Sequence, residues 1–134
     1  MSKDWVKDIN KMQEKYRVHK WVEGSDADRL RSYLHFRVDF LREELEETEA
    51  ALVSMDAEEI VDGLIDLCVV AIGTLDAFGV DPYKAWDEVL KANMNKVVGV
   101  KEGRPNPLGL PDLTKPKDWK SPSHEGNHGK LHDI

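Results

Sequence analysis

Apolar residues recur at helical spacing through most of the first hundred positions. In residues 4–20 one stripe carries Trp5, Ile9, Met12 and Tyr16. Residues 60–75, IVDGLIDLCVVAIGTL, leave almost no polar side, so a helix there should be largely buried. In residues 27–54 apolar or small residues recur at spacings of three or four, which predicts the main core face of a long helix: Leu30, Leu34, Val38, Leu41, Leu45, Thr48 and Leu52.

Capping residues divide this pattern into four helices. The connection at residues 54–59 is short, with Ser54 or Asp56 as N-cap, and the helix that follows it should end near Phe78 because Gly79 suits the position after a helix. Pro82 suits the first turn of a fourth helix that extends to about residue 98. No strand-like alternation competes with these helices. The predicted fold is an all-α four-helix bundle.

Composition changes after residue 101. The following segment holds five of the six prolines and four of the nine glycines, which predicts an extended or irregular tail that wraps over the helices or over a neighbouring subunit. Three histidines recur there every four residues, but the glycines among them argue against a helix that would align them on a metal, so a solvated tail is expected. We therefore predict a helical domain at residues 1–101 and a tail at 102–134.

Charge excludes some classes of partner. The net charge is −7, and residues 39–66 hold eleven acids and one base, so a basic surface for nucleic acid is not expected. The apolar stretch is too short and too acidic to cross a bilayer, and the N-terminus lacks the apolar core of a signal peptide. These features predict a cytoplasmic protein that binds neither nucleic acid nor membrane.

Carboxylates interrupt the apolar helix at residues 60–75. Asp62 and Asp66 are four residues apart and share one face, and Glu59 lies on the same face three residues before Asp62. An unpaired buried carboxylate is costly to keep ionised, so these groups need a compensating charge.

The preceding helix offers more acids on one flank. Glu44 and Glu47 share that flank with Arg37, and an antiparallel hairpin would bring the two glutamates opposite Asp62 and Asp66. Mg²⁺ and Mn²⁺ prefer oxygen ligands, whereas the lack of Cys and His here speaks against zinc. The acids are thus predicted metal ligands, and structural carboxylates paired with Arg or Lys are the alternative.

The segment REELEETEAALVSMDAEEIVDGLIDLCVVAIGTLDAFGVDP, with VLKANMNKV beyond it, resembles the all-α nucleoside triphosphate pyrophosphohydrolases of the MazG-like and phosphoribosyl-ATP pyrophosphohydrolase-like type. It resembles in particular the small single-domain type that is common in phages and bacteria. The family pattern is Glu-Glu-x-x-Glu followed by Glu-x-x-Asp on the next helix. It matches Glu43, Glu44 and Glu47, and then Glu59 and Asp62.

Two features depart from the family pattern. The spacing between Glu47 and Glu59 is short for the family, and counting back from the glycine that ends the helix selects Asp66 as the ligand, with Gly63 where a glutamate is usual. The pairings Glu59/Asp62 and Asp62/Asp66 both stay open.

The resemblance implies Mg²⁺-dependent cleavage of a nucleoside triphosphate, most readily a dNTP, to the monophosphate and pyrophosphate, with Mn²⁺ able to substitute. It implies Glu43 or Glu44 as general base, and Asn93 and Lys96 as nucleotide contacts, to which Arg37 is added from its place on the flank. It also implies a homodimer or homotetramer. Phosphoribosyl-ATP, dUTP or dCTP are alternative substrates, and a non-enzymatic helical dimerisation module is the alternative from another class.

Overall fold

The computed structural model describes residues 3–101, 103, 108–109 and 112–134. The chain forms two compact units, residues 1–82 with 128–134 and residues 83–127, which are described separately. The predicted tail includes residues 102, 104–107 and 110–111, which lie outside the described residues.

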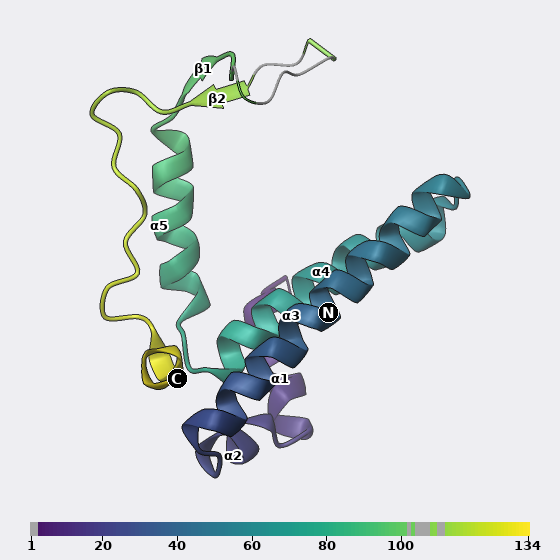
Figure 1. The fold of residues 1–134 in the computed structure, drawn as a ribbon, viewed down its shortest axis with the longest axis vertical. Helices are drawn as coiled ribbons and strands as arrows, with labels where there is room; N and C mark the ends of the chain where they lie inside the picture. The colour runs from purple at the N-terminus through teal and green to yellow at the C-terminus, as the bar shows by residue number, and fades with distance from the viewer. Residues whose placement is uncertain (1–2, 102, 104–107, 110–111) are drawn as a thin grey trace. The chain divides into compact units, whose positions relative to one another are not determined.

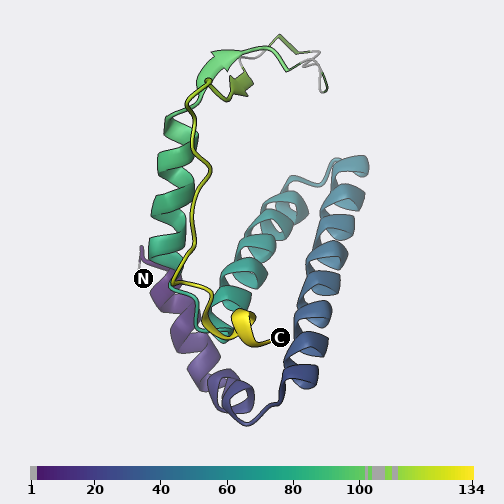
Figure 2. The same cartoon turned by 60° about the vertical axis from the view of Figure 1, so that its left-hand side comes forward.

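The first unit contains the helices α1 (Trp5–Lys15), α2 (Val18–Glu23), α3 (Ala27–Val53) and α4 (Ala57–Ala77). The two long helices, α3 and α4, lie side by side and antiparallel, and α1 also packs on α4 (Figures 1 and 2). Local signals set the hairpin, since Asp26 and Asp56 each cap the first turn of a helix through a side-chain oxygen. Gly79, at φ 74°, follows the end of α4 as predicted.

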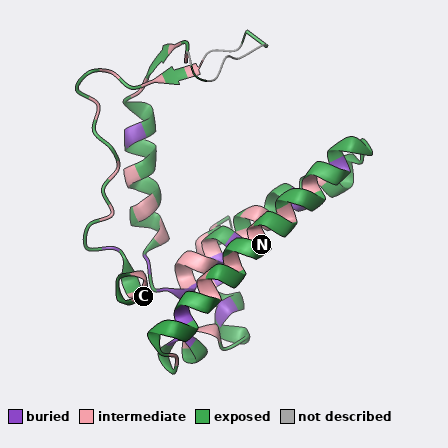
Figure 3. Ribbon diagram, in the orientation of Figure 1, coloured by how far each residue is buried: buried purple, intermediate pink, exposed green. Residues whose placement is uncertain are grey.

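Buried residues gather where α1, α2 and the far ends of the hairpin meet (Figure 3). Phe78 is fully buried and contacts Tyr33, whose ring also contacts Trp21. The other buried apolar residues of this unit are Ile9, Val22, Leu30, Ala51, Val70, Ala77 and Val80. The core therefore belongs mainly to one end of the α3–α4 pair.

The expectations for the length of the first helix and for the core face of α3 are wrong. The first helix does not continue to residue 20, because Arg17 adopts a left-handed conformation (φ 58°) and separates α1 from α2. The predicted core stripe of α3 is also only partly buried, since Val38, Leu45 and Leu52 are 44%, 56% and 59% exposed. The flank with Arg37 and Glu44 faces α4 instead.

The second unit begins within α5 (Pro82–Met94) and contains a strand pair that the sequence did not predict. Strand β1 (Val97–Gly99) pairs antiparallel with β2 (Asp112–Thr114), with Val97 opposite Thr114. As a result, α5 ends four residues earlier than expected. The chain beyond β2 is extended, as predicted, and runs back along α5 (Figures 1 and 2).

Residues 128–134 return to the first unit and include a 3₁₀ turn, η1 (Gly129–Asp133). The amide of Lys130 donates a hydrogen bond to the carbonyl of Phe78 at 2.7 Å. Gly129 lies so close that a Cβ there would collide with the same carbonyl. The end of the chain is therefore attached to the end of α4 and is not a solvated tail.

Among the described residues, no single helix is long and apolar enough to cross a membrane; α4 and α5 meet that test only when taken together, by length and composition.

Candidate functional site

The predicted acidic residues lie along the hairpin, towards its connecting turn. Glu44 on α3 and Asp66 on α4 are half-buried. Glu43, Glu47, Glu59 and Asp62 are exposed. The apolar surroundings of Asp62 in the sequence therefore do not bury it, because Val61, Leu64 and Ile65 around it are themselves exposed in the single chain.

Glu44 is the residue on which the other carboxylates converge. Burial raises the pKa of its carboxyl group, and the negative charges of Glu47, Asp66, Glu43 and Asp62 raise this pKa further. Two of those neighbours are on α3 and two on α4, so carboxylates from both helices act on one group. Glu59 is not among them.

A close crossing of the two helices positions these acids. Gly63 on α4 is buried against Thr48 on α3, and a Cβ at position 63 would collide with the Thr48 hydroxyl. That hydroxyl donates back to the Glu44 carbonyl at 2.8 Å. A residue with a side chain could not fit at position 63 unless Thr48 moved, so the close crossing requires glycine there. Asp62 and Asp66 flank the crossing.

The donor set fits a hard divalent cation, because the groups facing one another are all carboxylates. Within the described part of the chain, however, no three His, Cys, Asp or Glu side chains come close enough together to hold one ion. The described part of the single chain thus supplies carboxylate ligands but does not bring three of them together around one ion.

Arg37 occupies the other end of the same seam between α3 and α4. Its Nε donates to the Thr74 hydroxyl and its Nη2 to the Val70 carbonyl, each at 2.9 Å. Its guanidinium also lies over the rings of Tyr33 and Phe40, at 5.9 and 5.7 Å from their centroids. No ion pair joins Arg37 to a carboxylate in the described residues. Its contacts in the single chain are with neutral groups of the hairpin.

The two predicted nucleotide contacts on the fourth helix belong to the second unit. Asn93 is exposed in the last turn of α5. Lys96 lies just beyond the helix, is half-buried, and has its ammonium 5.5 Å from the centroid of the Trp119 ring. The sequence did not predict this contact with the tail.

A further polar network was also not predicted. The Asp76 carboxylate near the end of α4 is only 9% exposed, accepts a hydrogen bond from Asn10 Nδ2 at 2.9 Å, and lies 2.6 Å from His19 Nε2. His19 and Asp76 line a cavity of about 350 Å³ with Phe78 and Lys130. The partners come from α1, α2 and α4, so only the tertiary fold brings them together.

The three histidines of the tail do not all belong to the same unit. His128 and His132 stack with ring centroids 6.3 Å apart in the first unit. His124 belongs to the second unit, and its buried Nδ1 has no hydrogen-bond partner among the described residues.

Comparison with known proteins assigns the hairpin to a family. The family model described as phosphoribosyl-ATP pyrophosphohydrolase matches residues 11–93, which include α3, α4 and most of α5. The chain belongs to this family. Comparisons with curated proteins and with solved structures find no match.

Membership agrees with the all-α fold and with the resemblance seen in the motifs, since this family is part of the MazG-like all-α nucleoside triphosphate pyrophosphohydrolase superfamily. In broad terms it makes the protein a nucleotide pyrophosphohydrolase. The matched residues contain every predicted carboxylate.

Proposed function

We propose that the protein hydrolyses a nucleoside triphosphate, with a dNTP as the leading substrate, to the monophosphate and pyrophosphate in a metal-dependent reaction. The observation that carries this proposal is that the chain belongs to the pyrophosphohydrolase family; its acids on α3 and α4 support it, since the charges of Asp62 and Asp66 both raise the pKa of Glu44. Carboxylates drawn together in this way are the ligands expected for Mg²⁺ or Mn²⁺ beside a polyphosphate.

In this proposal Glu44, Glu47, Asp62 and Asp66 hold the cation, and Glu59, one turn before Asp62, is a further candidate. When bound, the metal supplies positive charge beside the phosphates and lowers the pKa of coordinated water. The exposed positions of Glu47 and Asp62 leave them accessible to a ligand from solvent.

Side chains of the protein would then orient the nucleotide and deprotonate the attacking water. Glu43 or Glu44 accepts the proton of the water that attacks the α-phosphorus, and the bond to the bridging oxygen breaks so that pyrophosphate leaves. Lys96 and Asn93 bind the nucleotide through its phosphates or sugar. Arg37 has a supporting role in the site, because two of its nitrogens already donate hydrogen bonds to groups on α4.

Phosphoribosyl-ATP is the second candidate substrate, because the matching family model carries that description. The same bond between the α- and β-phosphates would break, and the same residues would serve. Phosphoribosyl-ATP and a nucleoside triphosphate differ in the group attached to the adenine ring, or in the base and sugar that the protein must recognise.

We further propose that the protein is a homodimer or homotetramer. Val38, Leu45 and Leu52 of α3 and Val61 and Leu64 of α4 leave large apolar side chains exposed on the hairpin. A second copy that covers these residues would bury apolar area and could complete the ligand set.

A screen of the purified protein for pyrophosphate release tests the function. The substrates are the common NTPs, the dNTPs including dUTP and dCTP, and phosphoribosyl-ATP, each with Mg²⁺, with Mn²⁺ and with EDTA. We expect stoichiometric monophosphate and pyrophosphate with either metal and none with EDTA. Release of single phosphate, or turnover in EDTA, contradicts the proposal, and a strong preference for phosphoribosyl-ATP selects the second candidate.

A further inference from the structure

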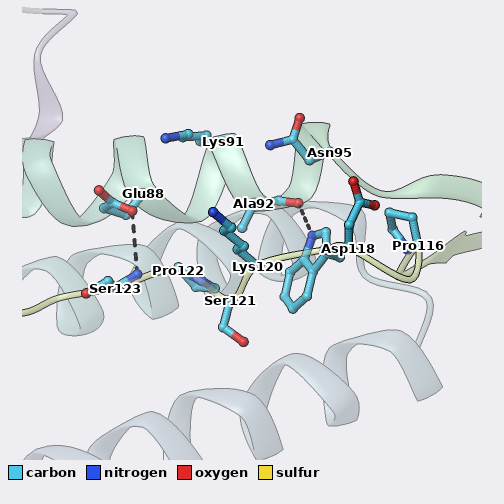
Figure 4. Close-up of a pocket in the computed structure, with 11 residues that line it drawn as sticks. Glu88, Lys91, Ala92, Asn95, Pro116, Asp118, Lys120, Ser121, Pro122 and Ser123 are labelled. Atoms are coloured by element: carbon cyan, nitrogen blue, oxygen red, sulfur yellow. Dashed lines mark hydrogen bonds between the residues drawn. The ribbon is translucent and has the colours of Figure 1, made fainter.

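Trp119 is fixed against α5 in the second unit. Its indole Nε1 donates a hydrogen bond to the carbonyl of the buried Ala92 at 2.6 Å (Figure 4). Its amide donates to the Pro116 carbonyl at 3.0 Å, which closes a turn just before the ring. The ring is half-buried, so its position is set both by its own segment and by the helix.

Two lysines meet at this ring. The ammonium groups of Lys96 and Lys115 lie 5.5 and 4.8 Å from its centroid, within the range of a cation–π interaction. No other lysine or arginine lies over this ring in the part of the chain that the structure describes.

The strand pairing brings the two lysines together. Lys96 directly precedes β1 and Lys115 directly follows β2, and the neighbouring residues Val97 and Thr114 are paired in the antiparallel register. The Thr114 hydroxyl also donates to the Val97 carbonyl at 3.2 Å. Residues far apart in the sequence are thus held as neighbours, and their like charges are brought close to one another.

A cavity of about 500 Å³ borders the same ring. Trp119 is part of its lining, together with Lys91, Asn95 and Lys120 as donors and Glu88 and Asp118 as acids (Figure 4). With Lys96 and Lys115 included, the region has more positive than negative side chains. A ligand with several anionic oxygens would offset the repulsion among these lysines.

We propose that Lys115 joins Lys96 in binding the polyphosphate group of a nucleotide on the second unit, and that Trp119 is the positioning residue for both lysines. The identity of those phosphates rests on the proposed function. A lysine side chain is long and flexible, and the ring face restrains its ammonium while leaving its N–H groups able to donate to phosphate oxygens. The end of α5 places Lys96 at the Trp119 ring, and the pairing of β1 with β2 places Lys115 there as well.

Binding of inorganic tripolyphosphate, measured by calorimetry in EDTA, tests the proposal. Without divalent cations the acidic hairpin repels phosphate, so the measurement reports the lysines. We expect Lys115→Ala and Trp119→Leu each to weaken binding by roughly threefold to tenfold. Trp119→Phe keeps a ring for the two ammonium groups and should largely restore binding. Lys117→Ala, two residues along the same exposed segment, is the matched control and should bind as the wild type does.

Two results would overturn the proposal: no binding of tripolyphosphate by the wild type, or unchanged binding by Lys115→Ala. Equal losses in Trp119→Leu and Trp119→Phe would overturn the positioning role of the ring. Lys115 is exposed, so its variant should stay folded, and melting curves check this for all variants. The screen for pyrophosphate release is a separate readout, so a protein that binds tripolyphosphate but hydrolyses no nucleotide would refute the function alone.

Discussion

The two ends of the α3–α4 pair are built differently. At one end Leu30, Val70 and Ala77 are buried, and Arg37 joins the helices through hydrogen bonds to neutral groups. At the other end Glu44 faces carboxylates that repel it, and Leu45 and Leu64 stay exposed. The first end is stable by its own contacts, whereas the second has unfavourable features that a cation and a second chain would relieve.

Removing one acid from the repelling end should have the largest effect, on activity. We expect Asp66→Asn to lower kcat/KM for the best substrate by about a hundredfold or more, because a neutral amide is a much weaker ligand for Mg²⁺. Asp39→Asn makes the same change on an exposed residue that forms an ion pair with Arg42, and should leave activity nearly unchanged. Similar activity in the two variants would exclude Asp66 from the metal site.

The exposed apolar residues at the same end predict association. We expect the wild type to sediment as a dimer or tetramer at micromolar concentration and Leu45→Glu to shift it towards monomer, because a charge would be buried in the interface. Val100→Glu places the same charge on an exposed apolar residue of the other unit and is the control. A monomeric wild type in analytical ultracentrifugation would refute this prediction.

Substitutions at the two ends should change the stability of the protein in opposite directions, and these are the smallest expected effects. In metal-free protein, Arg37→Met should lower the free energy of unfolding by about 1–2 kcal/mol, because it removes two hydrogen bonds to α4. Glu44→Gln should instead raise Tm slightly, by about 1–3 °C, because it removes a partly buried charge among like charges.

Thermal melts in EDTA followed by circular dichroism measure both changes, with Arg42→Met as the control for an exposed arginine. Destabilisation by Glu44→Gln of the same size as that by Arg37→Met would mean that Glu44 has a favourable partner, and the contrast between the two ends would be lost.

The hairpin was predictable because its signals are local. Asp56 begins α4 and Gly79 follows its end at the expected places, and the short connection requires an antiparallel pair. The acids were found for the same reason, since residues three and four apart share a helix face. The break at Arg17 carries no glycine or proline signal, so the sequence did not indicate it.

Features that depend on distant residues were not predictable. The strands β1 and β2 have three residues each and are stabilised by pairing across an intervening segment. Likewise, the spacing of Leu45 and Leu52 indicates an apolar face but not whether its partner is in the same chain. The contacts of Asp76 with His19 and Asn10 need three helices in place, and the contact of Trp119 with Lys96 needs the return of the tail along α5.

The attachment of Lys130 to Phe78 has a consequence for folding. It closes a loop of about fifty residues, so both ends of the segment at residues 83–127 are anchored in the same unit, as in a domain inserted into another. The hairpin can form early from contacts near in sequence, whereas this closure must wait for two distant residues to meet. The lysines around Trp119 are therefore held on a doubly tethered segment, and loss of the Gly129 contact would leave that segment attached at one end only.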